Sequence, residues 1–225
     1  MAKKKRKRVE AESPLVRFLR RNGQWARRLS IAAGLIAVVT AVWIIADPFG
    51  GAPTAIDESG REVPVGVIDR AGAAARPGRL APNFLLPNYD RQAVTLDQFE
   101  GRVVLINMWA SWCGECEWEM PGIIRVAEQF PDDVVVLLVN KGESKGTAQA
   151  WTRSRGFPED LTNLHWLVDS RQEVTSEYQM RGIPNSIFIE RSGVIHQIER
   201  QAINYDDVLS SVRSALNENS GASGN

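Results

Sequence analysis

The segments that follow residue 80 predict an α/β domain in which a mixed β-sheet is covered by helices on both faces. Short, near-continuous apolar runs, which are typical of strands buried on both faces, alternate there with segments of helical periodicity. Near the end of this alternation, Arg191-Ser192-Gly193 separates two strand-like runs and indicates a hairpin. The predicted order is β-α-β-α-β-α-β-β-α, with two parallel crossovers and a closing hairpin.

The central strand is predicted at 102–109 (RVVLINMW), an apolar run that leads toward Cys113. The helix that follows carries apolar residues on one side, and Pro121 is expected to kink it. The other elements are predicted in the same way: strands at 134–139, 165–168, 186–190 and 194–200, helices at 145–155 and 172–180, and a last helix that has Val208, Leu209, Val212 and Leu216 on one face and Asn204 or Asp206 as its cap.

The charges divide the chain into parts with different surroundings, although 27 basic and 27 acidic residues sum to a net charge of zero. Eleven lysines and arginines but only two glutamates precede Leu29, and the next eighteen residues, 29–46, carry no charge. At ~1.5 Å per residue, a helix of this length spans roughly 27 Å, close to a bilayer's hydrocarbon core of about 30 Å. The basic flank predicts a cytoplasmic N-terminus and a C-terminal part outside the cytoplasm.

The predicted organisation is a basic cytoplasmic arm (1–28), a transmembrane signal anchor (29–46), a flexible linker (47–80), an α/β domain (81–216) and a disordered tail (217–225). A cleaved signal peptide is the alternative, but the apolar stretch is long for one, and proline follows the nearest small residues. A buried core helix is disfavoured because the segment is apolar on all sides. The basic arm suits an anionic lipid surface better than nucleic acid, so the expected partner of this region is the bilayer.

The two cysteines, Cys113 and Cys116, lie three residues apart where the predicted central strand gives way to a helix. Unpaired N–H groups and the positive end of the helix dipole at such a position stabilise a thiolate and lower the thiol pKa. We expect Cys113 to be the more exposed and to attack, and Cys116, one turn into the helix, to resolve the mixed disulfide. A CxxC motif on a strand-to-helix turn of an α/β pattern is a strong signal of redox chemistry.

Two other roles for the pair are less favoured. A purely structural disulfide of this spacing closes a very small loop and constrains the unfolded chain little. A metal site needs four ligands, and the 2 histidines, His165 and His196, lie far downstream without paired spacing. The sequence contains no nucleotide-binding glycine motif and no evident haem attachment, so no bound metal or cofactor is predicted.

Residues 81–216 resemble the thioredoxin-like TlpA/ResA family, which includes the CcmG-type reductases of cytochrome c maturation. The resemblance rests on APNFLLP, VTLDQFEGRVVLINMWASWC and CEWEMP in the first half, and on YQMRGIP followed by SIFIERSGVI in the second. It implies a thioredoxin fold and a membrane-anchored protein that exchanges dithiols with disulfides.

The resemblance also implies roles for single residues. Pro184 would be the cis-proline that faces the disulfide, and the backbone of Ile183 would pair with a substrate strand. Trp112 would flank the first cysteine and contact substrate. Glu119 matches an acidic position of the family. It would be a partly buried carboxylate that raises thiol pKa values and exchanges a proton with the second cysteine, the alternative being an exposed helix acid.

Other positions bear on specificity. Asn107 stands where cytoplasmic thioredoxins carry a buried aspartate, which argues against a housekeeping thioredoxin. Glu115 departs from the proline that the family commonly has before its second cysteine. Glutamate keeps the backbone N–H, which favours the thiolate, but adds a negative charge, which opposes it. With Glu117 and Glu119 it forms an acidic cluster that is expected to repel acidic partners and to favour basic ones.

The function expected from these observations is reduction of protein disulfides through a Cys113 mixed disulfide outside the cytoplasm. A membrane electron donor such as a transmembrane thiol reductase would supply the electrons, and apocytochrome c is a candidate substrate by analogy with the family. Alternatives are a disulfide-donating oxidant, a peroxiredoxin-like antioxidant, a copper-binding chaperone of the Sco type and a non-catalytic interaction domain. The peroxiredoxin motif would need threonine at Ala110, and Sco proteins use CxxxC with a distal histidine, whereas the spacing here is CxxC.

Overall fold

The computed structural model describes residues 53–217. The predicted basic arm, the predicted transmembrane segment at 29–46 and all but the first residue of the predicted tail lie outside these residues. Within residues 53–217, no helix has both the length and the apolar character needed to cross a bilayer.

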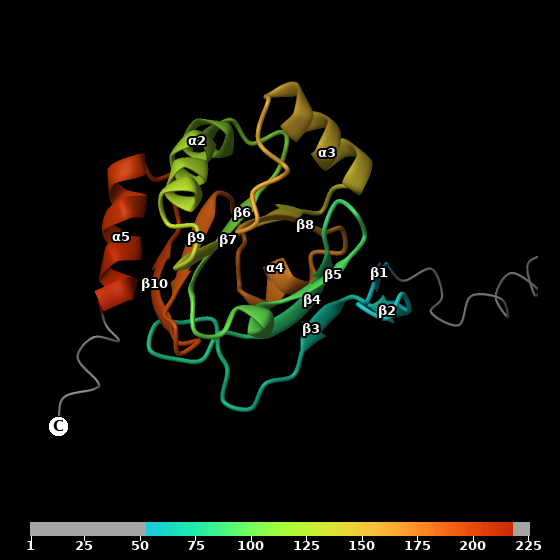
Figure 1. Cartoon of the computed structure of the whole chain (residues 1–225), viewed down its shortest axis with the longest axis horizontal. Helices are drawn as coiled ribbons and strands as arrows, with labels where there is room; N and C mark the ends of the chain where they lie inside the picture. Colours follow the sequence, from blue (N-terminus) through green and yellow to red (C-terminus); the bar gives the residue numbers. More distant parts are fainter. Residues whose placement is uncertain (1–52, 218–225) are drawn as a thin grey trace, which may run out of the picture. The chain divides into compact units, whose positions relative to one another are not determined.

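A five-stranded mixed sheet forms the centre of the domain, in the order β10-β9-β6-β7-β8 (Figure 1). The central strand β6 is buried at every position, as expected for an apolar run that is covered on both faces. It runs parallel to β7, β7 runs parallel to β8, and the hairpin β9–β10 is antiparallel to β6. The predicted mixed sheet with two parallel crossovers is therefore confirmed. The strands are β6 (Val103–Trp109), β7 (Val134–Lys141), β8 (Leu164–Asp169), β9 (Asn185–Ile189) and β10 (Ile195–Glu199).

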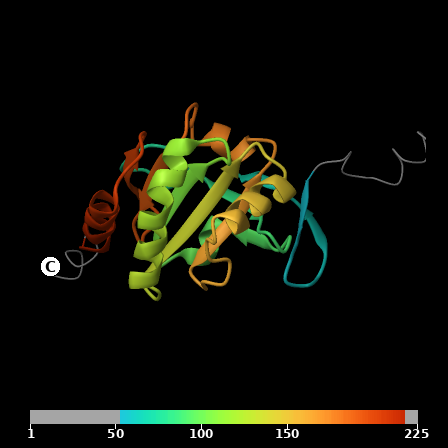
Figure 2. The same cartoon turned by 90° about the horizontal axis from the view of Figure 1, so that it is seen from above.

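Helices cover both faces of this sheet, as predicted. Buried residues of α2 and α5, together with Ala148 of α3, join one hydrophobic cluster with the inward side chains of β6 and β7. Val174 of α4 joins a second cluster on the opposite face. Figure 2 shows α2 and α3 next to each other across the same face of the sheet. The helices are α2 (Gly114–Gln129), α3 (Lys145–Ser154), α4 (Glu173–Glu177) and α5 (Tyr205–Asn217).

The ends of two helices follow from single residues. The helix predicted at 172–180 is shorter in the structure, because Gln172 and Gln179 on either side of α4 have positive φ values of 58° and 57° and leave the helical region. At the start of α5, the N–H of Asp207 donates to Oδ1 of Asn204 over 3.1 Å, so Asn204 is the cap. Helix α2 continues on both sides of Pro121.

The prediction of a flexible linker over 47–80 is wrong for the described residues 53–80. Three strands lie there, and the third pairs with β4 of the domain. The N–H of Gly78 also donates to the carbonyl of Ile195 over 2.8 Å, which ties the segment to β10. These strands are too short for a hydrophobic period to show in the sequence, and backbone pairing holds them. They are β1 (Thr54–Ile56), β2 (Glu62–Pro64) and β3 (Gly66–Ile68), followed by β4 (Asn83–Pro87), β5 (Ala93–Thr95) and the short 3-10 helix η1 (Leu96–Phe99).

The sheet β3-β4-β5 covers the face of the central sheet that α4 also covers. Phe84 of β4 is fully buried and meets the ring of Tyr178 edge-on, with 6.3 Å between ring centroids. Burial of such an aromatic side chain stabilises the fold by roughly 1.5–3 kcal/mol. The hydroxyl of Tyr178 donates to the carbonyl of Pro82 over 2.7 Å. This contact anchors the end of α4, from which the chain passes toward Pro184.

Candidate active site

Cys113 and Cys116 form a disulfide at the N-terminus of α2, with their Cα atoms 5.3 Å apart. Cys113 is the N-cap residue, and its sulfur accepts the N–H of Cys116 over 3.2 Å. Its exposed fraction is 8%, whereas Cys116 is at 0%. The order of exposure therefore matches the expectation that Cys113 meets the partner first and that Cys116 is shielded. After reduction, the same N–H and the helix dipole would stabilise a thiolate on Cys113.

Glu119 lies one helical turn after Cys116 and is buried, with an exposed fraction of 1%. Its Oε1 accepts a hydrogen bond of 2.6 Å from Nδ2 of Asn107, and its Oε2 accepts one of 3.1 Å from the N–H of Ile203. Burial raises the pKa of Glu119 to about 7, because the two hydrogen bonds offset only part of the desolvation of the carboxylate. The expected partly buried carboxylate is in fact almost wholly buried, and the alternative of an exposed helix acid is wrong.

Asn107 connects this carboxylate to the sheet. Its Nδ2 donates to Glu119 and also to Oγ of Ser186 over 3.0 Å, and Ser186 is its partner in the ladder between β6 and β9. Its Oδ1 is buried and has no partner among the described residues. Rotation of the amide by half a turn would aim this acceptor at Glu119, where it could receive the proton of the neutral acid. The site can therefore hydrogen-bond Glu119 in both protonation states.

The peptide bond between Ile183 and Pro184 is cis, as the sequence resemblance implied. Pro184 is buried, and Ile183 packs against the hydrophobic cluster that contains both cysteines. Neither the N–H nor the C=O of Ile183 has a hydrogen-bond partner within residues 53–217. An unpaired backbone at the end of the sheet that leads to the disulfide is the feature that an incoming extended peptide needs for main-chain pairing.

Two tryptophans lie exposed around the disulfide. Trp112 precedes Cys113 and is 70% exposed, so it is placed for contact with a partner as expected. Trp118, which the sequence analysis did not single out, is 62% exposed on α2. The only sequence feature that could have indicated this exposure is the position of Trp118, three residues after Glu115 and therefore on the polar side of the helix. Large apolar side chains in such positions mark interaction surfaces when they gather.

The predicted acidic cluster is only partly an exposed feature. Glu115 is exposed, but Glu117 is paired with Arg155, whose Nε donates to its Oε1 over 2.8 Å and whose guanidinium lowers the pKa of Glu117. Glu119 faces the interior. The cluster therefore presents one unpaired carboxylate to solvent rather than three, and the expected preference for basic partners rests on Glu115.

Sequence analysis also missed Glu143, which holds the loop in front of the cysteine pair. Its carboxylate accepts the N–H of Ser111 over 2.8 Å and the hydroxyl of Ser111 over 2.5 Å. Nδ2 of Asn140 donates to the same carboxylate over 2.7 Å. The contact joins residues 32 positions apart, and no local pattern in the sequence announces it.

Neither histidine comes to the cysteine pair. His165 stands near the beginning of β8 and contacts the ring of Phe99 at 5.1 Å between centroids. His196 lies near the beginning of β10, where its Nδ1 is 3.4 Å from Glu190. His196 lies toward the end of the sheet opposite the disulfide, and His165 is level with Ile106 in the middle of β6. A copper site with a distal histidine therefore finds no support. Within residues 53–217, no group of three or more His, Cys, Asp or Glu side chains is arranged to hold a metal ion.

Comparison with known proteins places this geometry in a family. The AhpC/TSA family model matches residues 77–198. The thiol-disulfide oxidoreductase ResA of Geobacillus kaustophilus is 27% identical over 139 residues, which are 60% of this chain and 75% of that protein.

Two solved structures share the fold. A thiol:disulfide interchange protein DsbE from Chlorobium tepidum aligns with a TM-score of 0.56 and 24% identity, over 62% of this chain and 97% of that one. The exposed lipoprotein thioredoxin of Streptococcus pneumoniae aligns with a TM-score of 0.50 and 28% identity, over 59% and 98%. The chain therefore belongs to the AhpC/TSA family and is a thiol–disulfide oxidoreductase similar to ResA.

Proposed function

We propose that this oxidoreductase reduces disulfides of protein substrates outside the cytoplasm, with residues 29–46 as its membrane anchor. The observation that carries the proposal is the position of Glu119, which lies one helical turn after the shielded Cys116 and is buried, so that its pKa is raised to about 7. Such a carboxylate can accept a proton near neutral pH, which the release of a resolving thiolate requires. The relatives' names support thiol–disulfide exchange, and one of them is described as an exposed lipoprotein.

The reaction begins with the reduced dithiol. The Cys113 thiolate attacks one sulfur of the substrate disulfide, a mixed disulfide forms, and the other substrate sulfur leaves as a thiolate that takes a proton from water. Ile183 would hold the substrate strand by its free N–H and C=O, while the exposed Trp112 next to Cys113 would contact the substrate. These two residues set the geometry of attack and take no part in electron transfer.

Resolution uses the second cysteine. Glu119 accepts the proton of Cys116, and the resulting thiolate attacks the sulfur of Cys113. The second substrate sulfur leaves as a thiolate that takes a proton from water, and the enzyme is left with the Cys113–Cys116 disulfide. The substrate has gained two electrons, and the enzyme has lost two. A dithiol donor at the membrane, such as a transmembrane thiol reductase, would restore the dithiol, and apocytochrome c is one candidate substrate.

The direction of exchange is tested by the reduction potential of the purified full chain, titrated with dithiothreitol or glutathione buffers and followed by tryptophan fluorescence. A value near or below about −230 mV is expected for a reductant. A value near about −120 mV, as in a strong periplasmic oxidant, would make the protein a disulfide donor and overturn the proposed direction. The proposed topology is tested separately by adding protease to spheroplasts, where residues 81–216 should be digested while the basic arm stays protected.

A further inference from the structure

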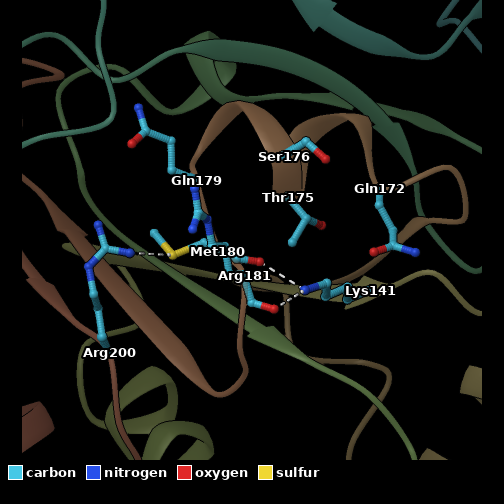
Figure 3. A pocket seen from close by; sticks show the side chains of 8 residues that line it. All are labelled: Lys141, Gln172, Thr175, Ser176, Gln179, Met180, Arg181 and Arg200. Carbon is cyan, nitrogen blue, oxygen red and sulfur yellow. Dashed lines mark hydrogen bonds between the residues drawn. The ribbon is translucent and has the colours of Figure 1, made fainter.

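A cationic cavity lies beside the loop that carries the cis-proline. It has a volume of about 720 Å³, and its charged lining consists of Lys141, Arg181 and Arg200, with no aspartate or glutamate among the lining residues (Figure 3). The neutral lining is largely polar and includes Gln172, Thr175 and Gln179. Two other cavities in the described part of the chain are lined in part by carboxylates, at Asp207 and at Glu159, and so differ in charge from this one.

The register of the sheet places this cavity at the same edge as the disulfide. Trp109, the last residue of β6, is paired with Asn140 of β7, and Lys141 follows directly. On the other side of β6, Asn107 is paired with Ser186 and Ser186 with Glu199, so Arg200 is level with the last residues of β6, at the same end of the sheet. Arg181 belongs to the loop between α4 and β9, two residues before Ile183. The chain that leads to the cis-proline is thus also a wall of the cavity.

Lys141 and the two arginines differ in whether their side chains already have hydrogen-bond partners in the fold. Nζ of Lys141 donates to the carbonyls of Met180 and Arg181 over 2.8 and 3.0 Å, so it holds the loop in place, as Figure 3 shows. Arg200 contacts only the sulfur of Met180, at 3.5 Å, and the guanidinium of Arg181 has no partner within residues 53–217. Both arginines are exposed and lack a carboxylate. They are therefore free to bind an anion, whereas other arginines of the domain, such as Arg155 and Arg191, are already paired.

The two sides of the disulfide consequently differ in charge. On the α2 side, Glu115 is exposed and unpaired next to the cysteines. On the cis-proline side, Arg181 and Arg200 line an open cavity. A substrate strand held by the backbone of Ile183 would run from one side to the other, so the residues before and after its cysteine would meet opposite charges.

We propose that the cavity of Arg181 and Arg200 is a binding subsite for an acidic segment of the protein substrate, close in sequence to the cysteine that Cys113 attacks. Guanidinium groups bind carboxylates through paired N–H donors, and two unpaired ones at the rim can hold one or two such side chains. A volume of about 720 Å³ is on the order of twenty times the share of one water in the liquid, which suits a stretch of polypeptide better than a single small anion. The proposal rests on the proposed disulfide exchange and adds a rule for which substrates are preferred.

The test uses the reduced full chain and three synthetic peptides, each with a single cysteine linked by a disulfide to 2-nitro-5-thiobenzoate. One peptide is neutral, one carries three aspartates before the cysteine, and one carries them after it. Release of the coloured thiol reports exchange with each peptide, and the leaving group is common to all three. One of the two acidic peptides is expected to react about fivefold faster than the neutral peptide, because a few exposed charge contacts contribute modestly. The advantage should shrink at high salt.

The double variant Arg181→Gln/Arg200→Gln should bring that ratio to about one and leave the rate with the neutral peptide unchanged. Arg213→Gln is the matched control, since Arg213 is exposed on α5, which packs on the opposite face of the sheet from α4. Failure of all three peptides to react would overturn the proposed exchange itself. Normal reaction of the neutral peptide with no advantage for either acidic peptide would overturn only the subsite. Arginine-dependent binding of inorganic phosphate without an acidic-peptide advantage would show a free anion site instead, and would also overturn it.

Discussion

Glu119 and Asn107 meet in the interior between α2 and β6, where Nδ2 of the amide donates to Oε1 of the carboxylate over 2.6 Å. One hydrogen bond from an amide and one from the N–H of Ile203 do not replace the water that a carboxylate loses on burial. The pKa of Glu119 therefore rises to about 7 instead of falling. Both the chemistry of the cysteine pair and the stability of the fold should respond to this single group.

The first prediction concerns stability against pH. Burial raises the pKa of Glu119 to about 7 from its ordinary value of 4.5, so between these pH values the folded state keeps a proton that the unfolded state has already lost. The free energy of unfolding should therefore fall as pH rises through this window, by about 3 kcal/mol from this group. In the Glu119→Gln variant, this pH-dependent decrease in the free energy of unfolding should be absent. Urea unfolding of the oxidised protein at pH 4.5 and pH 8 measures the difference.

An exposed acid on the same helix supplies the control for this experiment. Glu128→Gln should leave the pH profile as it is in the wild type, because Glu128 lies at the surface of α2. Parallel profiles for wild type and Glu119→Gln would contradict the raised pKa.

The second prediction separates the roles of the two cysteines. Cys113→Ser should abolish the reduction of insulin by dithiothreitol-recycled protein, since the attacking sulfur is lost. Cys116→Ser should also stop turnover but accumulate a covalent enzyme–substrate complex, because no thiolate remains to resolve it. Non-reducing gel electrophoresis after alkylation distinguishes the two. Retention of wild-type activity by both variants would refute dithiol exchange at this pair.

The third prediction concerns the positioning residue Glu143. Glu143→Ala leaves the N–H and hydroxyl of Ser111 and the amide of Asn140 without their acceptor. Loss of hydrogen bonds to a charged group should lower the free energy of unfolding by about 2 kcal/mol. It should also loosen the loop that carries Trp112, so kcat/KM for disulfide reduction should fall about tenfold. Glu143→Gln keeps one acceptor oxygen and should recover most of the rate, whereas equal losses in both variants would argue against positioning through this contact.

Local pattern explains which parts of this architecture were predictable from the sequence. The burial of β6 on both faces leaves an uninterrupted apolar run, and the CxxC pair follows it, so strand and site could be located together. Helix α4 was overestimated because its limits depend on the left-handed backbone of Gln172 and Gln179, for which side-chain periodicity carries no signal.

Contacts between distant residues were out of reach of the same method. Glu143 reaches Ser111 across 32 positions, and Arg200 reaches the cavity only because β10 pairs with β9 beside β6. The resemblance to the family could single out Glu119 as an acidic position. It could not show that the carboxylate is buried and hydrogen-bonded to Asn107 and to the backbone of Ile203. The sequence thus located the reacting sulfurs, and tertiary packing determines the groups that tune and orient them.

The fourth prediction concerns the segment 53–80, for which the sequence suggested a flexible linker. A fragment that begins at residue 81 loses the pairing of β3 with β4 and the backbone hydrogen bonds from Gly78 to Ile195 and from Ile195 to Arg79, at 2.8 Å each. At about 0.5–1.5 kcal/mol for each net hydrogen bond, we expect it to be less stable than a fragment that begins at residue 53 by about 3 kcal/mol. The melting temperature should fall by about 6–12 °C, because 1 kcal/mol corresponds to roughly 2–4 °C in a domain of this size.

A fragment that begins at residue 66 is the matched control for that truncation. It lacks β1 and β2 but keeps β3 and the contacts of Gly78, so most of the stability should return. Calorimetry of the three oxidised fragments measures the melting temperatures, and insulin reduction shows whether each retains an active site. Equal melting temperatures for the fragments from 53 and from 81 would mean that the segment adds no stability, as a true linker would. A loss that the fragment from 66 does not recover would assign the stabilisation to β1 and β2 instead.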